Sequence, residues 1–172
     1  MSKPVVGIVC GSDSDLPILK GATKVFDEFN VPYEISVCSA HRTPDRAAKY
    51  VQTAEERGIE VIIGAAGVAA HLPGVLAAGT TLPIIGIPIA SGPMAGEDAL
   101  YSIVQMPPGI PVATMAINGA KNAALFAIQI LAAKEAELRK QLKEYRKKMA
   151  EEVDAKHAKL QQVGIDEYIA NK

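Results

Sequence analysis

Short apolar runs, rich in valine and isoleucine, alternate with helical patterns along the chain and limit its fold more than any other feature. The runs cover residues 5–10, 33–38, 61–65, 82–89 and 110–117. A continuous apolar run such as VVGIVC at 5–10 is typical of a strand that is covered on both faces. Five such strands alternating with helices predict an α/β protein with one parallel sheet and helices on both sides. The expected fold class is a three-layer, doubly wound sheet with the flavodoxin-like strand order.

The segments between and after the strands carry helical patterns, predicted over residues 16–29, 45–57, 97–105 and 122–133. Beyond them, a long helical extension carries an apolar stripe. The stripe consists of Leu138, Leu142, Tyr145 and Met149, which are four, three and four residues apart. Such a helix overshoots a sheet of short strands, so its stripe needs partner surface, and a homo-oligomer provides it. We expect one domain over residues 1–150, including this helix, and a helical tail over residues 151–172.

Composition excludes several classes of function. The chain has 172 residues and a formal net charge of -1, and its basic residues concentrate in one late helix among glutamates, so no nucleic-acid surface is predicted. No cluster has metal-ligand spacing. The first residues lack a signal-peptide pattern and no apolar run reaches the ~18 residues of a membrane span, so we expect a cytoplasmic protein. Cys10 and Cys38 are expected to be buried thiols, although the sequence leaves a disulfide between them open.

The stretch SAHRTP at residues 39–44 follows the second predicted strand and opens the next helix. Thr43 is expected to cap that helix, which leaves unpaired backbone N–H groups near the strand end. Helix N-termini attract anions, Arg42 adds a permanent cation and Ser39 a hydroxyl, so a phosphate site is predicted. His41 lies among these donors, and histidine exchanges protons readily near neutral pH, which indicates proton transfer on a phosphorylated small molecule. A polar loop histidine bonded to backbone is the alternative.

Two serines and two aspartates occupy the turn after the first strand, GSDSD at residues 11–15. Ser12 and Ser14 can cap the following helix and donate hydrogen bonds to a ligand. Carboxylates would repel a phosphate, so Asp15 is expected to accept hydrogen bonds from a ribose diol or a ring amine. Ordinary capping is the alternative for Ser14 and Asp15. The chain has no GxGxxG or Walker sequence, so neither a dinucleotide nor a nucleoside triphosphate is indicated.

Small residues follow the third strand, in AGVAAHLPG at residues 66–74. They let the backbone approach a ligand closely, and Gly67 can adopt a positive φ if the turn requires it. Tight packing of helix on sheet is the alternative use of these residues. His71 is a second candidate base. The loop ASGPMAG at 90–96 is rich in turn residues and is expected to form a mobile cover over the site.

These turns are distant in the sequence, but each follows a strand of the same predicted sheet. In open parallel sheets, ligands bind beyond the carboxyl ends of the strands, where the strand order switches. The flavodoxin-like order would bring the turns after the first three strands together. We therefore expect one shared site that contains Ser12, His41 and Gly67.

Four motifs in unbroken order strongly resemble those of the PurE family, the N5-carboxyaminoimidazole ribonucleotide mutases of purine biosynthesis. They are GSDSD at 11–15, SAHRTP at 39–44, AAHLPG at 69–74 and SIVQMPPGIPVAT at 102–114, and the resemblance covers residues 4–149. It implies a flavodoxin-like domain assembled as a homo-octamer whose subunits share active sites. It also implies a reaction without cofactor, in which the carboxylate on the exocyclic nitrogen of an aminoimidazole ribonucleotide moves to the neighbouring ring carbon.

The resemblance also implies roles for individual residues. Ser12 and Asp15 match the family's residues at the ribose end of the substrate. Ser39 and Arg42 match the residues at its phosphate, and His41 matches the acid/base residue.

The third turn matches the family's loop around the imidazole and the carboxylate through Gly67, His71 and Leu72. A reaction that releases and recaptures carbon dioxide needs a dry pocket of small apolar groups, which this loop supplies. Two departures are visible. Val68 stands where many bacterial members have a second glycine, close to where carbon dioxide would be held, and NGAK at 118–121 shortens a segment of small residues.

Two other functions stay open. The first is direct carboxylation of aminoimidazole ribonucleotide by carbon dioxide, the reaction of the family's second class, which the HRTP and AAHLPG sequences resemble less. The second is a non-catalytic module that binds a phosphorylated ligand such as flavin mononucleotide. A flavin site would place aromatic side chains against the ring, and the strand-end turns contain none.

Overall fold

A computed structural model describes residues 3–171 of the 172-residue chain. The chain divides into two compact units between Leu131 and Ala132. The first unit contains the sheet and all the predicted site residues, and the second is helical. Within residues 3–171, no helix combines the length and the apolar character needed to cross a membrane. The expected division into a domain and a tail at residue 150 stays a prediction.

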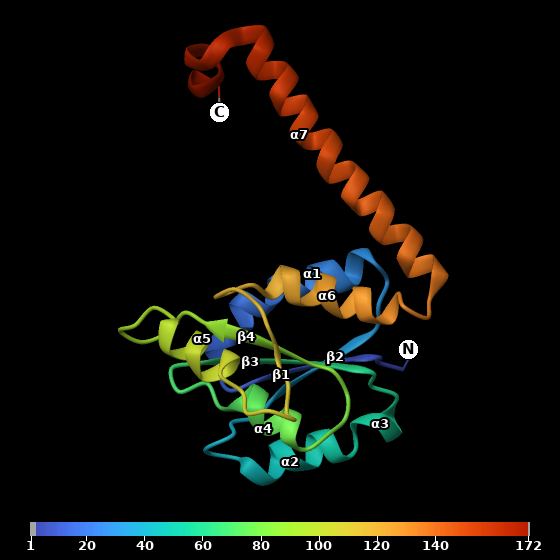
Figure 1. Ribbon diagram of the computed structural model, residues 1–172, viewed down its shortest axis with the longest axis vertical. Coiled ribbons are helices and arrows are strands. Elements are labelled where there is room, and N and C mark those ends of the chain that lie inside the picture. Colours follow the sequence, from blue (N-terminus) through green and yellow to red (C-terminus); the bar gives the residue numbers. More distant parts are fainter. Residues whose placement is uncertain (1–2, 172) are drawn as a thin grey trace. The chain divides into compact units, whose positions relative to one another are not determined.

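The first unit is built on a five-stranded parallel sheet with the order β2-β1-β3-β4-β5 (Figure 1). The strands are β1 (Val6–Cys10), β2 (Tyr33–Val37), β3 (Val61–Gly67), β4 (Ile84–Ile89) and β5 (Ala113–Thr114). At the end of β1, Cys10 lies beside Val37 of β2 and Ala65 of β3. The strand order confirms the predicted flavodoxin-like fold and places the carboxyl ends of β2, β1 and β3 next to one another.

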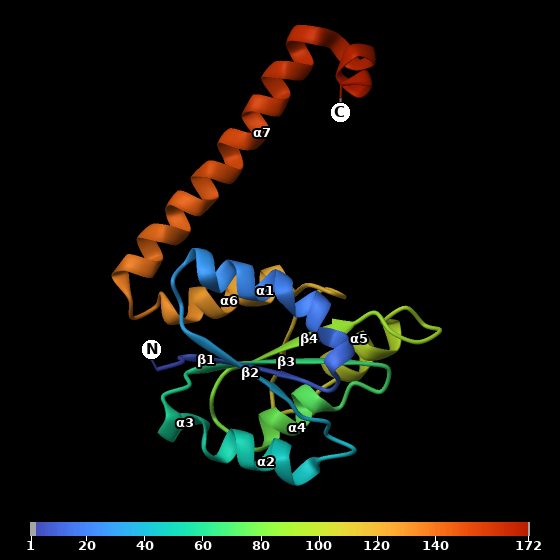
Figure 2. The same ribbon diagram turned by 180° about the vertical axis from the view of Figure 1, so that it is seen from behind.

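Helices cover both faces of this sheet (Figures 1 and 2). On one face, α1 (Leu16–Glu28) packs beside α6 (Ala120–Leu131). The other face carries α2 (Pro44–Gln52), α3 (Ala54–Arg57), α4 (Leu72–Ala78) and α5 (Glu97–Val104). Buried side chains from these four helices form one apolar cluster with Val9 and Ile62 of the sheet. The predicted three-layer arrangement is therefore confirmed.

The central strands are buried on both faces, which explains their continuous apolar sequence. Ile8, Ile63 and Ile85 are fully buried, and each such side chain contributes about 1.5–3 kcal/mol relative to an exposed one. Gly64 and Gly86 lie side by side in β3 and β4. A Cβ on Gly64 would press against Leu76 and Pro73 of α4 at 3.2–3.3 Å, so the glycine lets that helix pack close to the sheet.

The fifth strand and the second helix differ from prediction. The strand predicted over residues 110–117 shrinks to β5, because Pro111 has no N–H to donate and the strand lies at the sheet edge. The helix predicted over residues 45–57 divides at Thr53 into α2 and α3. The Thr53 hydroxyl donates to the Lys49 carbonyl at 3.0 Å, and a threonine bonded to its preceding turn bends helices.

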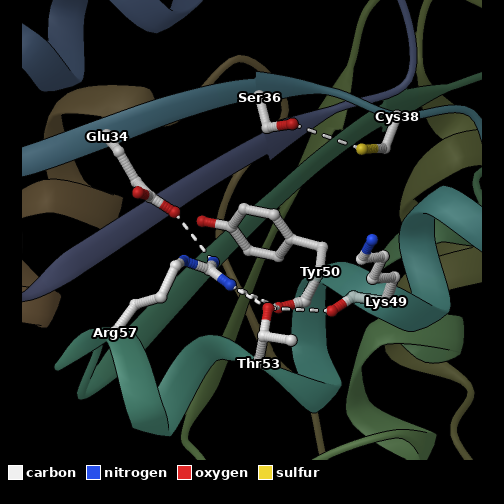
Figure 3. Close-up of polar contacts among 7 residues, drawn as sticks. All are labelled: Glu34, Ser36, Cys38, Lys49, Tyr50, Thr53 and Arg57. Carbon is white, nitrogen blue, oxygen red and sulfur yellow. Dashed lines mark hydrogen bonds and ion pairs between the residues drawn. The ribbon is translucent and has the colours of Figure 1, made fainter.

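A polar cluster ties α2 and α3 to β2 (Figure 3). The Arg57 guanidinium donates to Glu34 at 2.9 Å, hydrogen-bonds the Thr53 hydroxyl and lies 4.7 Å from the centroid of the Tyr50 ring. The Tyr50 hydroxyl is buried without a hydrogen bond of normal geometry. Burial, and then the Glu34 carboxylate, raise the pKa of Tyr50 above its usual range, so the phenol stays neutral.

Both cysteines are free thiols. Cys10 ends β1, Cys38 follows β2, and both are buried. The burial expected from the sequence is confirmed, and the disulfide that the sequence left open is not formed. Burial, and then the Asp15 carboxylate, raise the pKa of Cys10 to about 11.

The second unit consists mainly of α7 (Ala136–Ala170), which carries the predicted stripe. Its regular helix is interrupted at Gly164, where φ is +77°. Near its start, the Arg139 guanidinium donates to the carbonyls of Ala132 at 2.8 and 3.1 Å and of Ala133 at 2.8 Å. The exposed large apolar side chains of this helix are Met149, Val153, Ile165 and Ile169.

Candidate active site

A cavity of about 480 Å³ opens at the carboxyl ends of β1, β2, β3 and β4. Ligands of open α/β sheets bind in this position. All the residues predicted for the site line it: Ser12, Ser14, Asp15, Ser39, His41, Arg42, Gly67, His71 and Leu72. The expected convergence of three distant turns is therefore confirmed, because the strand order brings their strand ends together.

The turn after β1 is held by its own side chains. The Ser12 hydroxyl accepts hydrogen bonds from the Ser14 N–H at 3.3 Å and the Ser14 hydroxyl at 2.9 Å, while the Asp15 carboxylate accepts from the Ser12 N–H at 3.1 Å. This capping box joins Ser12 to Asp15 across the turn η1 (Asp13–Asp15), so the capping alternative is correct for Asp15 but not for the Ser14 hydroxyl, which bonds Ser12. The same residues also line the cavity.

Asp15 is the one buried charged side chain among the described residues, with 5% of its surface exposed. Its carboxylate makes no salt bridge within residues 3–171. Burial is the main cause that raises the pKa of Asp15, and the Ser12 N–H opposes it. A carboxylate has about four acceptor positions, so Asp15 can also accept from the hydroxyl or amine donors of a ligand.

The turn after β2 places a cation beside the end of β1. The Thr43 hydroxyl accepts from the Ser39 N–H at 3.0 Å and donates to the Ser39 carbonyl at 3.1 Å. Thr43 therefore closes this turn and does not cap α2 with its side chain, which corrects the prediction. The Arg42 guanidinium donates to the Gly11 carbonyl at 3.2 Å and to the Ser39 hydroxyl at 3.4 Å. Arg42 makes no salt bridge in the described part of the chain, so its charge is available to an anion.

His41 and His71 meet across the cavity. The His41 Nε2 and His71 Nδ1 atoms are 2.8 Å apart, and the rings meet edge to face with centroids 4.9 Å apart. Only one of these two nitrogens can carry the hydrogen of the bond, so each ring determines which tautomer its partner adopts. A protonatable pair of this kind, beside the anion-binding turn, can give a proton to a ligand and take one back.

The turn after β3 fits closely against the loop after β4. A Cβ on Gly67 would collide with the Ser91 hydroxyl and lie 3.1 Å from the Ile89 carbonyl, so a larger residue would require Ser91 to move. Ser91 lines the cavity, and sequence reasoning missed it as a site residue. The available signal was its position at the carboxyl end of a strand, which it shares with Ser12 and Ser39.

Val68, next to Gly67, has φ +55° and also lines the cavity. The left-handed region is disfavoured for a β-branched residue and costs about 1–3 kcal/mol. The sequence singled out this position as a departure from the PurE pattern, but nothing in it predicted the backbone conformation.

A larger cavity of about 890 Å³ lies at the amino ends of β4 and β5, lined by residues such as Leu82, Ile110 and Phe126. None of the described residues that line it is charged or titratable. Because acid–base chemistry requires such groups, we assign the chemistry to the smaller cavity. The smaller cavity is lined by no Phe, Tyr or Trp side chain, which disfavours a flavin ring. Within residues 3–171, no three His, Cys, Asp or Glu side chains gather as metal ligands do.

The fold and the cavity define the class of protein: a flavodoxin-like α/β domain with a histidine pair beside an anion-binding turn. Residues 5–152 match the family described as AIR carboxylase. The chain belongs to this family, and the resemblance to PurE is confirmed.

Individual relatives agree with the family. The chain is 56% identical over 168 residues to the N5-carboxyaminoimidazole ribonucleotide mutase of Pyrococcus horikoshii, covering 98% of this chain and 95% of that protein. It is 54% identical over 169 residues to the protein of the same name from Thermotoga maritima, covering 98% and 99%. Its structure is similar to the crystal structure of Treponema denticola PurE, with a TM-score of 0.81 and 29% sequence identity over 91% of this chain and 98% of that one.

Proposed function

We propose that this chain catalyses the isomerisation of N5-carboxyaminoimidazole ribonucleotide to 4-carboxy-5-aminoimidazole ribonucleotide in purine biosynthesis. Family membership and the names of the relatives support this reaction. The structural observation that carries it is the hydrogen bond between His41 and His71 in a cavity that also contains an unpaired cation and a turn of small residues. Proton transfer needs the histidine pair, and binding of a phosphate needs the cation. Retention of a small apolar gas needs the turn of small residues.

The reaction conserves all atoms. The bond between the exocyclic nitrogen and the carboxylate breaks, carbon dioxide leaves, and the nitrogen takes a proton. The neighbouring ring carbon attacks the same carbon dioxide and then loses its own proton, so no oxidant or reductant is consumed. One histidine can give the first proton and take the second, and such general acid–base catalysis contributes ~10²- to 10⁴-fold.

The binding roles follow from the charges around the cavity. Arg42 and the Ser39 hydroxyl bind the phosphate, since Arg42 makes no salt bridge within residues 3–171 and its forked guanidinium suits a phosphate. Ser12, Ser14 and Asp15 bind the ribose, whose hydroxyls can donate to the buried carboxylate and accept from the serines.

The chemical roles belong to the second and third turns. His41 is the acid/base residue, and His71 orients its ring and sets its tautomer through their hydrogen bond. Gly67 and Leu72 surround the imidazole and the migrating carboxylate with small apolar surface. Such surface excludes water while carbon dioxide is free.

The catalytic domain spans residues 1–150 and assembles as a homo-octamer in the cytoplasm, with residues 151–172 as a helical tail. Exposed apolar side chains in both units support self-association. Ile35 and Val37 on the edge strand β2 are 43% and 40% exposed, and Met149 of α7 is 50% exposed. Light scattering of the purified protein measures the subunit number, and a monomer would contradict the assembly.

Two separate assays test the reaction. One supplies N5-carboxyaminoimidazole ribonucleotide, and the other supplies aminoimidazole ribonucleotide with bicarbonate. We expect turnover of the first substrate at low bicarbonate. Turnover of only the second would make the protein a carboxylase, the activity that the family description names. Protein that binds neither nucleotide and is purified with a yellow cofactor would favour the flavin-binding alternative.

A histidine variant tests the acid/base role. His41→Asn removes the titratable ring and is expected to lower kcat by at least about 10²-fold while nucleotide binding is kept. His157→Asn is the matched control, because His157 is an exposed residue of α7 that lines neither cavity. A near wild-type rate for His41→Asn would show that His41 is not the base.

A further inference from the structure

Val68 has a backbone conformation that its residue type disfavours. Four described residues other than glycine have positive φ: Asn30, Val68, Ala95 and Asn118. Asparagine visits this region readily, whereas valine has a branched Cβ that crowds the backbone there. Val68 at +55° is therefore the most strained of these positions, and a glycine would occupy it without strain.

Packing of the fold does not explain why valine occupies this position. The Val68 side chain is 50% exposed, whereas the apolar residues of the core are less than a tenth exposed. It therefore gains little from burial. Strain that persists at a site without a gain in packing indicates a functional constraint.

The surroundings of Val68 indicate what that function is. Its side chain lines the cavity between Gly67 and Ala69, and its Cγ2 atom faces Gly92 of the loop after β4, where an added Cβ would lie 3.5 Å away. Gly92 itself has φ +69°. The turn after β3 thus presents an isopropyl group to the cavity beside a glycine of the loop after β4.

We propose that Val68 is a specificity-determining residue of the mutase reaction, whose side chain retains carbon dioxide until the ring carbon recaptures it. This inference rests on the proposed function. The carbon dioxide formed when the carbon–nitrogen bond breaks is small and apolar, and either it forms the new carbon–carbon bond or it escapes and leaves aminoimidazole ribonucleotide. A branched apolar side chain that lines the cavity leaves the gas less room to escape and forms no hydrogen bond with it.

The partition of one substrate between these two products tests the proposal. Each enzyme is given N5-carboxyaminoimidazole ribonucleotide in buffer with ¹³C-bicarbonate. The ratio of aminoimidazole ribonucleotide to carboxylated product, and the ¹³C content of that product, are corrected for breakdown without enzyme. Val68→Ala removes two carbons from the side chain, and we expect the ratio to rise at least about tenfold, the low end of the effect of one methylene in an apolar pocket. The ¹³C content should rise with it, because gas from solution replaces the gas that escaped.

Val75→Ala is the matched control, since Val75 is 42% exposed on α4 and does not line the cavity. We expect its product ratio to equal that of the wild type. An unchanged ratio for Val68→Ala, or an equal rise for Val75→Ala, would overturn the proposal. Wild-type enzyme that does not convert the substrate at all would instead overturn the proposed function.

A second variant separates the reaction from the fold. Val68→Gly removes both the side chain and the strain, so its urea midpoint should lie above that of the wild type while its product ratio rises at least as far as that of Val68→Ala. A lower midpoint would mean that Val68 serves packing, and would overturn the assignment.

Discussion

A methyl group added to Gly7 would measure how closely α2 packs against β1. Gly7 lies inside β1, and a Cβ there would collide with the Tyr50 hydroxyl and lie 3.2 Å from the Tyr50 Cζ atom. The ring has little freedom to retreat, because the Arg57 guanidinium lies 4.7 Å from its centroid on the side of α3 (Figure 3). Overpacking of a core costs about 1–3 kcal/mol, whereas replacing glycine by alanine in a strand otherwise gains about 0.5–1 kcal/mol. Gly7→Ala should therefore lower the free energy of unfolding by about 1–2 kcal/mol.

A second substitution identifies the atom responsible. Tyr50→Phe removes the colliding oxygen, which has no normal hydrogen bond to lose, so alone it should change the free energy of unfolding by less than about 1 kcal/mol. In the Tyr50→Phe background, the added Cβ of Gly7→Ala meets ring carbons at 3.2 and 3.4 Å, and most of its cost should disappear.

Urea denaturation of the wild type, the two single variants and the double variant completes the cycle. We expect a coupling energy of about 1 kcal/mol or more, against the ~0.3–0.5 kcal/mol within which independent sites add. An equal cost of Gly7→Ala in both backgrounds would refute the reasoning, because the hydroxyl would then not limit the packing.

Three further predictions concern charge and protonation. Burial raises the pKa of Asp15, so the protonated carboxyl favours folding and the ionised carboxylate opposes it. This stabilisation is present at low pH and is lost as the pH rises through the pKa of Asp15 in the folded state. Asp15→Asn should therefore raise the melting temperature at neutral pH while weakening nucleotide binding in calorimetry. Arg42→Lys loses the forked contact to phosphate and should weaken nucleotide binding about tenfold, whereas Arg46→Lys, outside the cavity, should not. The pKa of Cys10 rises from 9.0 to about 11 on folding, so its contribution to stability is present below pH 9 and is lost by pH 11. At about 1.4 kcal/mol per pH unit, this loss is about 2–3 kcal/mol in urea denaturation, and Cys10→Ala should abolish it.

The sheet and the location of the site could be predicted because both follow from simple periodic patterns. Buried parallel strands are continuous apolar runs, and the turns that follow them share one edge of the sheet. Ser12, His41 and Gly67 could therefore be placed together without any knowledge of distances.

What sequence reasoning missed depends on backbone geometry and on contacts between distant segments. Thr43 matches the pattern of a helix cap, yet its hydroxyl bonds back to Ser39, and the sequence alone does not decide between these two partners. Ser91 joins the cavity because the loop after β4 approaches Gly67, a contact between separate strands. The positive φ of Val68 contradicts its residue type, and such exceptions are expected at functional sites.

The hydrogen bond between the His41 and His71 rings limits the positive charge that the two rings can carry together. Two such rings have four nitrogens, and the bond of 2.8 Å exists only while one of the facing nitrogens carries no hydrogen. This bond can form when both rings are neutral or when one of them is protonated, whereas hydrogens on both facing nitrogens would break it. These two states differ by one proton, and the proposed isomerisation transfers one proton to the nitrogen and removes one from the ring carbon. If His41 is the acid/base residue as proposed, the pair holds the same number of protons after the reaction as before it.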